Sequence, residues 1–167
     1  MTSLIENKDK ILLTALKEVP FDGWSPAVLA LSGKECGFSN VETSVLFQGG
    51  VTDLVNHFSN YADRKMSEEY EKEVGKAKGV GQKVSLAVKL RFEILESHKE
   101  AVRKAIAYYA LPLRLPIGAH RVYETADTIW SLVGLKSTDF SFYTRRATLA
   151  GILTGTTLFW LADTSEG

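Results

Sequence analysis

Hydrophobic residues recur along this chain at the spacing of an α-helix. In the first helical segment, five apolar residues fall at i, i+1, i+4, i+5 and i+8, which places them on one helical face: Ile11, Leu12, Ala15, Leu16 and Val19. We find no alternating runs of β-branched and aromatic residues bounded by tight turns, the pattern typical of strands. The sequence therefore predicts an all-α protein.

Turn residues divide this pattern into segments. The stretch VPFDGWSP ends the first helix near Val19, and Ser25 with Pro26 makes a favourable N-cap and first helical residue. The expected helices cover residues 8–19, 26–35, 41–47, 52–78, 82–97, 99–110, 117–133 and 139–162. We predict two domains: a helix-turn-helix-like domain of short helices in residues 1–50, and a helical ligand-binding domain in residues 51–167.

The charge of the chain gives no bulk attraction to nucleic acid or to anionic membranes. Its 167 residues contain 20 Lys+Arg and 20 Asp+Glu, so the formal net charge is +0. The single cysteine, Cys36, excludes an internal disulfide and fits a reducing compartment. The first ten residues resemble neither a signal peptide nor a transit peptide. We therefore expect a cytoplasmic, bacterial protein, unless a presequence has been removed.

The N-terminal segments resemble the DNA-binding domain of the tetracycline-repressor family. FDGWS lies where those proteins turn into the helix-turn-helix, NVETSVLF takes the place of the recognition helix, and QGGVTDLVNHF resembles the start of the linking helix. DNA binding needs Lys or Arg side chains to neutralise phosphates and to reach base edges. Between Lys34 and Arg64 there is neither. We therefore favour a retained scaffold, with sequence-specific DNA binding as the alternative.

The sequence offers no recognised catalytic or metal-binding motif. None of His57, His98 and His120 follows a Glu or Asp by three residues, so the E-x-x-H pairs of helical di-iron sites are absent. One cysteine excludes the cysteine-based zinc clusters, and no G-x-S-x-G, P-loop or G-x-G-x-x-G occurs. We predict a protein that is not an enzyme and has no cofactor or metal of its own.

Residues 147–162 form an uncharged stretch within the last expected helix. This stretch is shorter than the roughly 20 apolar residues of a membrane span, and it contains four threonines and two glycines. Ala147, Gly151 and Gly155 recur every four residues as a stripe of small side chains on one face. Such a stripe permits the close approach of another helix or leaves room for a ligand.

An ordinary bundle core and a lipid-binding pocket both fit the apolar residues around this stripe, because clefts between helices are a common place for ligand sites. If there is a pocket, we expect its lining to come from three of the expected helices. The lipid-binding candidates are Leu86, Leu90, Ile94, Tyr109, Leu149, Leu153 and Phe159.

Two further features allow either a structural or a binding role. Arg145 and Arg146 precede the uncharged stretch, and one of them must face away from the core. The binding interpretation is contact with a lipid head group or an acidic partner. The structural interpretation is an ion pair with a nearby carboxylate, for which the candidates are Asp139, Asp127 and Glu124. Similarly, the Leu-Pro corner ALPLRLP and the helix that carries Trp130 are either core or an exposed interaction surface.

Three blocks of the sequence resemble the accessory lipid-binding proteins of coenzyme Q (ubiquinone) synthesis. This family is the ninth in the eukaryotic naming scheme and has α-proteobacterial relatives. The blocks are EVPFDGWSPAVL at residues 18–29, LFQGGVTDLVNHFSNYADRKM at residues 46–66, and VGLKSTDFSFYTRRATLAGIL after Trp130. The resemblance spans about residues 8–165, and the last block is the most specific.

This resemblance implies a tetracycline-repressor-like fold that is not used as a repressor, with an isoprenoid lipid bound among the C-terminal helices. It also implies delivery of a ubiquinone precursor to a di-iron hydroxylase that supplies the iron. The partner-binding patch of the family corresponds here to Leu111, Pro112, Asp127 and Trp130. We expect a homodimer that associates through its last two long helices, as is usual for the repressor fold.

The resemblance has one departure. The family usually continues past W-x-x-D-x-S into an amphipathic helix that helps the protein reach the membrane, whereas this sequence ends at LADTSEG. Either the chain is truncated or this member lacks the helix, and we expect at most a peripheral contact with the inner membrane. Two rival functions stay open: a ligand-responsive transcription regulator, and a protein-interaction adaptor without a ligand.

Overall fold

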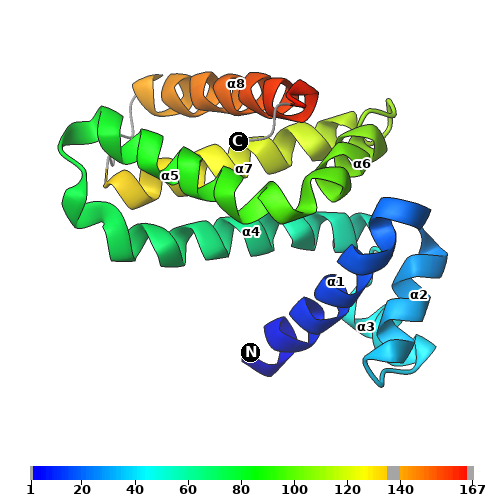
Figure 1. Cartoon of the computed structure of the whole chain (residues 1–167). Coiled ribbons are helices and arrows are strands. Elements are labelled where there is room, and N and C mark those ends of the chain that lie inside the picture. The colour runs from blue at the N-terminus through cyan, green and yellow to red at the C-terminus, as the bar shows by residue number, and fades with distance from the viewer. Residues whose placement is uncertain (1, 135–139, 165–167) are drawn as a thin grey trace. The chain divides into compact units, whose positions relative to one another are not determined.

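The computed structural model describes residues 2–134 and 140–164, and the regular structure of these residues is helical throughout (Figure 1). The all-α prediction is confirmed for this part of the chain, while the repressor-like arrangement stays a prediction. Two 3-10 turns, η1 (Val74–Lys76) and η2 (Glu96–His98), follow α4 and α5. The α-helices are α1 (Thr2–Asp22), α2 (Pro26–Glu35), α3 (Asn40–Leu46), α4 (Val51–Glu73), α5 (Gly79–Leu95), α6 (Lys99–Tyr109), α7 (Leu115–Val133) and α8 (Phe140–Ala162).

The first helix ends later than the sequence predicts. α1 passes through Pro20 and ends at Asp22, and the backbone N–H of Gly23 bonds to the carbonyl oxygen of Val19 at 2.8 Å. Pro20 has no N–H to donate, yet the helix continues past it for two residues. Gly23 has a φ of 73°, a left-handed conformation that closes a helix and favours glycine. The stop signal is therefore the glycine rather than the proline.

The first compact unit contains Met1–Tyr61 and His98–Leu111. It therefore joins α1, α2, α3 and the start of α4 to α6, which lies much later in the sequence. The Trp24 indole N–H donates a hydrogen bond to the backbone oxygen of Ala101 on α6 at 3.1 Å. This bond and the packing of α1 against α6 hold the two distant segments together.

Within this unit, α2 and α3 are two short helices in close contact. The Ser25 and Ser39 hydroxyls accept hydrogen bonds from backbone N–H groups in the first turns of α2 and α3, which is the expected N-cap arrangement. A Cβ added at Gly33 of α2 would meet the Oγ1 atom of Thr43 on α3 at 2.1 Å. Glycine at position 33 is thus required by how closely the two helices approach.

The second compact unit contains Ala62–Ser97 and Pro112–Gly167. Helix α7 packs against both α5 and α8 (Figure 1). Side chains from α4, α5, α7 and α8 form its core, which we call the apolar cluster: Met66, Tyr70, Ala87, Leu90, Ala126, Ile129, Leu149 and Leu153.

The compact units group the helices differently from the predicted domains, residues 1–50 and 51–167, which stay a prediction. The start of α4 and all of α6 group with the N-terminal helices. The contacts that cause this grouping join residues far apart in sequence: Tyr109 on α6 donates a hydrogen bond from its hydroxyl to the Asn56 side chain on α4 at 2.5 Å. Local sequence patterns carry no information about such a pair of residues.

Candidate functional site

Helix α8 divides its uncharged stretch between a buried and an exposed face. On the buried face, Leu149 and Leu153 belong to the apolar cluster, and Leu161 is also buried. Near the end of the helix, the Trp160 indole N–H donates to the Glu96 carboxylate at 2.7 Å. This face therefore holds α8 against the rest of the second unit.

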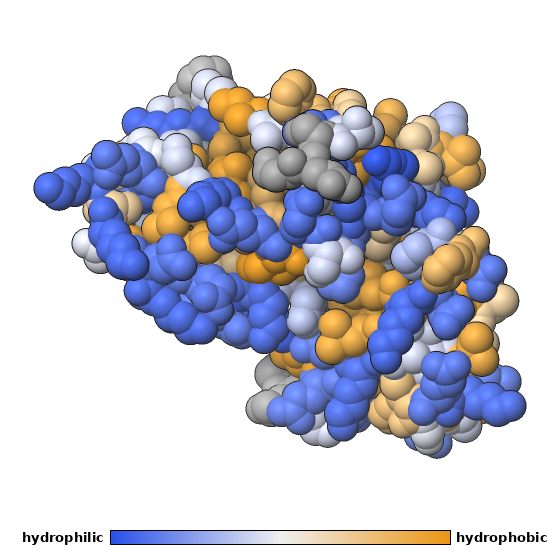
Figure 2. Space-filling model, in the orientation of Figure 1, coloured by the Kyte–Doolittle hydropathy of each residue, from blue (hydrophilic) through white to orange (hydrophobic). Residues whose placement is uncertain are grey.

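The opposite face of α8 is made of small and apolar residues that are exposed. Ile152, Leu158 and Phe159 are exposed, the last of them by 75%. A Cβ built at Gly151 or Gly155 meets no described atom within 4 Å, so no neighbouring helix of the described chain fills the small-residue stripe. Figure 2 shows orange residues among paler ones along the edge where Figure 1 places α8. An uncharged helix face of this kind is typical of an interaction surface.

Of the two arginines before the uncharged stretch, Arg146 is the one that is buried. Its Nε donates to the Asp127 carboxylate on α7, which confirms the ion pair predicted with one of three candidate acids. Arg145 is exposed, and its backbone oxygen accepts a hydrogen bond from the Trp130 indole N–H at 3.2 Å. The Asp127 side chain stays 48% exposed despite this ion pair. Asp139, another candidate acid, lies outside the described residues.

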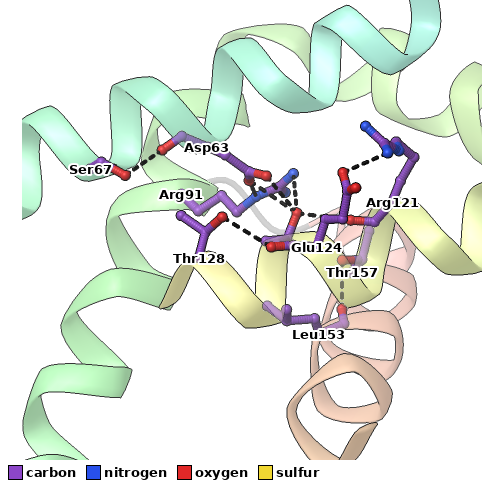
Figure 3. A network of polar contacts seen from close by, with 9 residues as sticks. Asp63, Ser67, Arg91, Arg121, Glu124, Thr128, Leu153 and Thr157 are labelled. Atoms are coloured by element: carbon purple, nitrogen blue, oxygen red, sulfur yellow. Dashed lines mark hydrogen bonds and ion pairs between the residues drawn. The ribbon is translucent and has the colours of Figure 1, made fainter. Parts of the chain in front are cut away.

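A second ion pair is buried deeper in the same unit (Figure 3). Arg91 Nε on α5 donates to Asp63 Oδ1 on α4 at 2.9 Å, and the Thr125 hydroxyl on α7 donates to Asp63 Oδ2 at 2.9 Å. One carboxylate therefore ties three helices together. This network could not be predicted from the sequence, because its members are separated by 28 and 62 positions and no local pattern links them.

A groove lies at the corner where η1 leads from α4 into α5. Its volume is about 350 Å³. One of its lining residues, Leu86, also packs against the apolar cluster, so the groove adjoins the core of the second unit. The lining residues are Glu73, Lys76, Ala77, Gly81, Gln82, Ser85, Leu86 and Lys89.

An open, shallow surface in the first unit is formed by α3 and the turn after it, with the residues Asn40, Val41, Ser44, Val45 and Gln48. The two valines are exposed on the helix that would read DNA in a repressor. Because apolar and neutral side chains cannot neutralise phosphates, this surface is poorly suited to DNA.

Five of the seven residues predicted to line a pocket gather at the apolar cluster. Three of them belong to it and two are partly buried against it: Leu90, Leu149, Leu153, Leu86 and Ile94. The other two lie elsewhere. Tyr109 belongs to the first unit, where its hydroxyl bonds to Asn56. Phe159 lies on the exposed face of α8.

The predicted partner-binding residues fall into two pairs. Asp127 and Trp130 lie one turn apart on α7, and both bond to α8 through Arg146 and the backbone of Arg145. Leu111 and Pro112 are exposed in the turn between α6 and α7. The division between the compact units falls between these two residues.

Tyr70 is a buried residue that sequence analysis did not single out. It is 3% exposed and belongs to the apolar cluster, yet its hydroxyl has no hydrogen-bond partner among the described residues. Burial raises the pKa of this hydroxyl, so the group is neutral at ordinary pH. Its spacing of four residues from Met66 marks the core face of α4, but nothing in the sequence shows where the polar end of the side chain goes.

The described residues offer neither a metal-holding cluster nor a membrane-spanning helix. In residues 2–134 and 140–164, no group of three or more His, Cys, Asp or Glu side chains is arranged to hold a metal ion. No helix in the same part of the chain is both long enough and apolar enough to cross a membrane.

The fold and the site define an all-α protein whose second unit combines a buried apolar cluster with an uncharged, exposed helix face. Comparison with known proteins narrows this class. Residues 115–167 match the COQ9 family model. The chain is 33% identical over 165 residues to the mitochondrial ubiquinone biosynthesis protein COQ9 of Drosophila melanogaster, a match that covers 95% of this chain and 49% of the relative.

Other relatives give similar values. The mitochondrial COQ9-B protein of Xenopus laevis is 32% identical, with 95% of this chain and 56% of the relative covered. The human COQ9 protein is 30% identical, and the match covers 93% of this chain and 51% of the human protein. The predicted resemblance is confirmed: this chain is related to the COQ9 family. It spans about half the length of the curated relatives that it matches.

Proposed function

We propose that this chain is a lipid-binding accessory protein of ubiquinone biosynthesis and is not an enzyme. It binds an isoprenoid lipid and presents a ubiquinone precursor to a di-iron hydroxylase, the partner that supplies the metal. The relatives are named as ubiquinone biosynthesis proteins, and their similarity over most of this chain supports the same pathway here.

The observation that carries lipid binding is the convergence of five predicted pocket residues on the apolar cluster. An isoprenoid chain is hydrocarbon, and its burial is favourable by about 0.8 kcal/mol for each CH₂-sized group. The groove at the α4–α5 corner adjoins the cluster through Leu86. The lipid enters from this corner.

The experiment that tests this function is mass spectrometry of an organic extract of the purified protein, with a native spectrum recorded beside it. The expected result is an isoprenoid lipid at about one per chain. An empty extract, together with no uptake of added isoprenoid lipid, would overturn lipid binding and favour an adaptor.

Two variants locate the lipid. Leu86→Gln places a polar group where the groove adjoins the apolar cluster, and it should lower lipid retention several-fold. Phe159→Ser removes an exposed ring from the opposite face of α8 and should leave retention unchanged. If only Phe159→Ser loses lipid, the outer face of α8 is the binding surface and the entrance at the α4–α5 corner is wrong.

The hydroxylase partner is tested with a matched pair of exposed leucines in one turn. Leu111 belongs to the proposed partner-binding residues, whereas Leu113, two residues later, does not. Leu111→Glu should weaken binding of the purified di-iron hydroxylase at least tenfold, and Leu113→Glu should not. Equal effects of the two variants, or none, would remove Leu111 from the partner-binding surface.

A second copy of the chain covers the outer face of α8 in this proposal. The small-residue stripe and the exposed Ile152 and Phe159 offer an apolar surface that two copies can share. Sedimentation velocity should show a dimer that Phe159→Lys dissociates and that Glu71→Lys, an exposed change on α4, leaves intact. A monomer at all concentrations would overturn the homodimer.

A further inference from the structure

The Tyr70 hydroxyl is the polar group of the apolar cluster whose position the fold does not explain. The side chain is 3% exposed and packs among the hydrophobic side chains of α4, α5, α7 and α8. No described residue bonds to its hydroxyl. Buried hydroxyls in folded proteins are normally hydrogen-bonded, because leaving one without a partner opposes folding. A phenylalanine would fill the same space without that cost.

The surroundings restrict what could bond to this hydroxyl. Burial raises the pKa of Tyr70, so the group keeps its proton and can donate a hydrogen bond. A carboxylate or phosphate brought beside it would be a buried charge facing one neutral donor, which is unfavourable. A neutral oxygen on an apolar molecule meets no such penalty. The chemistry therefore selects a carbonyl or a ring hydroxyl.

The groove lies near Tyr70 along α4 and shares a residue with the shell of the apolar cluster. Glu73 of the groove follows Tyr70 by three residues on α4, and Leu86 belongs to both the groove lining and the shell of the cluster. Val74 and Val84 also come from this corner, and both are only partly buried against the cluster. The groove is polar at Lys76 and Lys89, whereas the cluster beyond Leu86 is apolar.

From these observations we infer that Tyr70 is a ligand-binding residue, whose hydroxyl donates a hydrogen bond to a neutral ring oxygen of a quinone or phenol that enters at the α4–α5 corner. This inference rests on the proposed function, and it adds the group that would distinguish a ring-bearing precursor from a plain isoprenoid hydrocarbon. Such selection follows because a site with a buried donor favours ligands that satisfy it over ligands that leave it unpaired.

The test uses two probes that differ in the ring oxygens. Decylubiquinone carries a quinone ring, and squalene is an isoprenoid hydrocarbon without oxygen. Binding of each is measured by quenching of tryptophan fluorescence and by native mass spectrometry, with the full chain and with Tyr70→Phe. The expected result is a loss of about tenfold in quinone affinity, the size of one hydrogen bond, with squalene affinity unchanged. Tyr143→Phe, at an exposed tyrosine of α8, is the matched control and should change neither.

The outcomes separate this inference from the function on which it rests. If the unchanged protein binds neither probe, the proposed lipid binding fails. If it binds both and Tyr70→Phe binds the quinone equally well, the lipid function stands and the role of Tyr70 fails. Urea unfolding without ligand gives a further check: Tyr70→Phe should be at least as stable as the unchanged protein. A clear loss of stability would mean that the hydroxyl has a structural partner, which would overturn the inference.

Discussion

Gly33 of α2 and Gly155 of α8 both lie inside helices, but their surroundings differ. A Cβ added at Gly33 would meet Thr43 Oγ1 at 2.1 Å, whereas one added at Gly155 meets no described atom within 4 Å. In the first unit, therefore, the small residue is required by contact between two helices of the same chain. In the second unit the fold of the described chain does not require it. The comparison shows which glycine the fold explains and which points to a surface for another molecule.

The largest expected effect tests whether the two faces of α8 differ as the structure shows. Leu153→Ala removes a side chain from the apolar cluster and should lower the free energy of unfolding by about 2–5 kcal/mol, through lost burial and a cavity. Its neighbour Ile152 is exposed, so Ile152→Ala should change stability by about 0.5 kcal/mol or less. Urea denaturation measures both. Similar losses in the two variants would mean that the outer face is also packed in the folded chain.

A smaller effect is expected at the close contact of the first unit. Gly33→Ala forces a methyl group against Thr43, which is buried and whose hydroxyl donates to the backbone oxygen of Ser39, so it cannot easily move. Overpacking of this kind should lower the free energy of unfolding by about 1–3 kcal/mol.

Combining Gly33→Ala with Thr43→Ala removes the two atoms nearest to the new methyl group, and the double variant should be more stable than the two single losses together predict. Strict additivity in urea denaturation would show that the contact between α2 and α3 is not the reason for the glycine.

At Gly155 an added methyl group is expected to stabilise the protein, in contrast to Gly33. Because its added Cβ meets open space, Gly155→Ala should raise the free energy of unfolding of a dilute monomer by about 0.5–1 kcal/mol, through helix propensity alone. If a second copy packs on this stripe, the same methyl group should weaken association in sedimentation experiments. If Gly155→Ala instead lowers the free energy of unfolding of the monomer, the space beside Gly155 is occupied, and the contrast with Gly33 is wrong.

Much of the fold could be predicted because its signals are local. The apolar spacing in α1 and the N-cap at Ser25 with Pro26 each lie within a few residues, and the structure has helices at both places. The end of α1 was placed too early because the stretch VPFDGWSP holds several helix-breaking residues, and the left-handed backbone of Gly23 marks where the helix ends. A sequence shows that a glycine is present, but not that its φ is positive.

For the candidate site, the sequence could predict burial of apolar residues but not its polar contacts. Leu90, Leu149 and Leu153 were predicted as apolar residues of the long helices and are buried together, whereas Phe159, predicted with them, is exposed. The polar part depends on which helices become neighbours. The Asp63 carboxylate accepts hydrogen bonds from residues 28 and 62 positions away. Tyr70 stands out because its buried hydroxyl has no hydrogen-bond partner among the described residues. Neither property can be read from residues near in sequence.

The smallest expected effect is a pH dependence in the first unit, where His98 lies beside Phe58 with ring centres 6.2 Å apart. Desolvation lowers the pKa of His98, so the folded protein keeps this ring neutral where the unfolded chain takes up a proton, at about pH 6.5 and below. The unfolded state then binds more protons, and the free energy of unfolding should fall as pH drops from 8 to 5.5. His98→Gln should reduce this fall, whereas His120→Gln, at a ring that is 61% exposed in the second unit, serves as the control. If urea denaturation shows the same fall with and without His98, burial of this histidine does not contribute to the stability of the first unit, and the packing around Phe58 is looser than the structure shows.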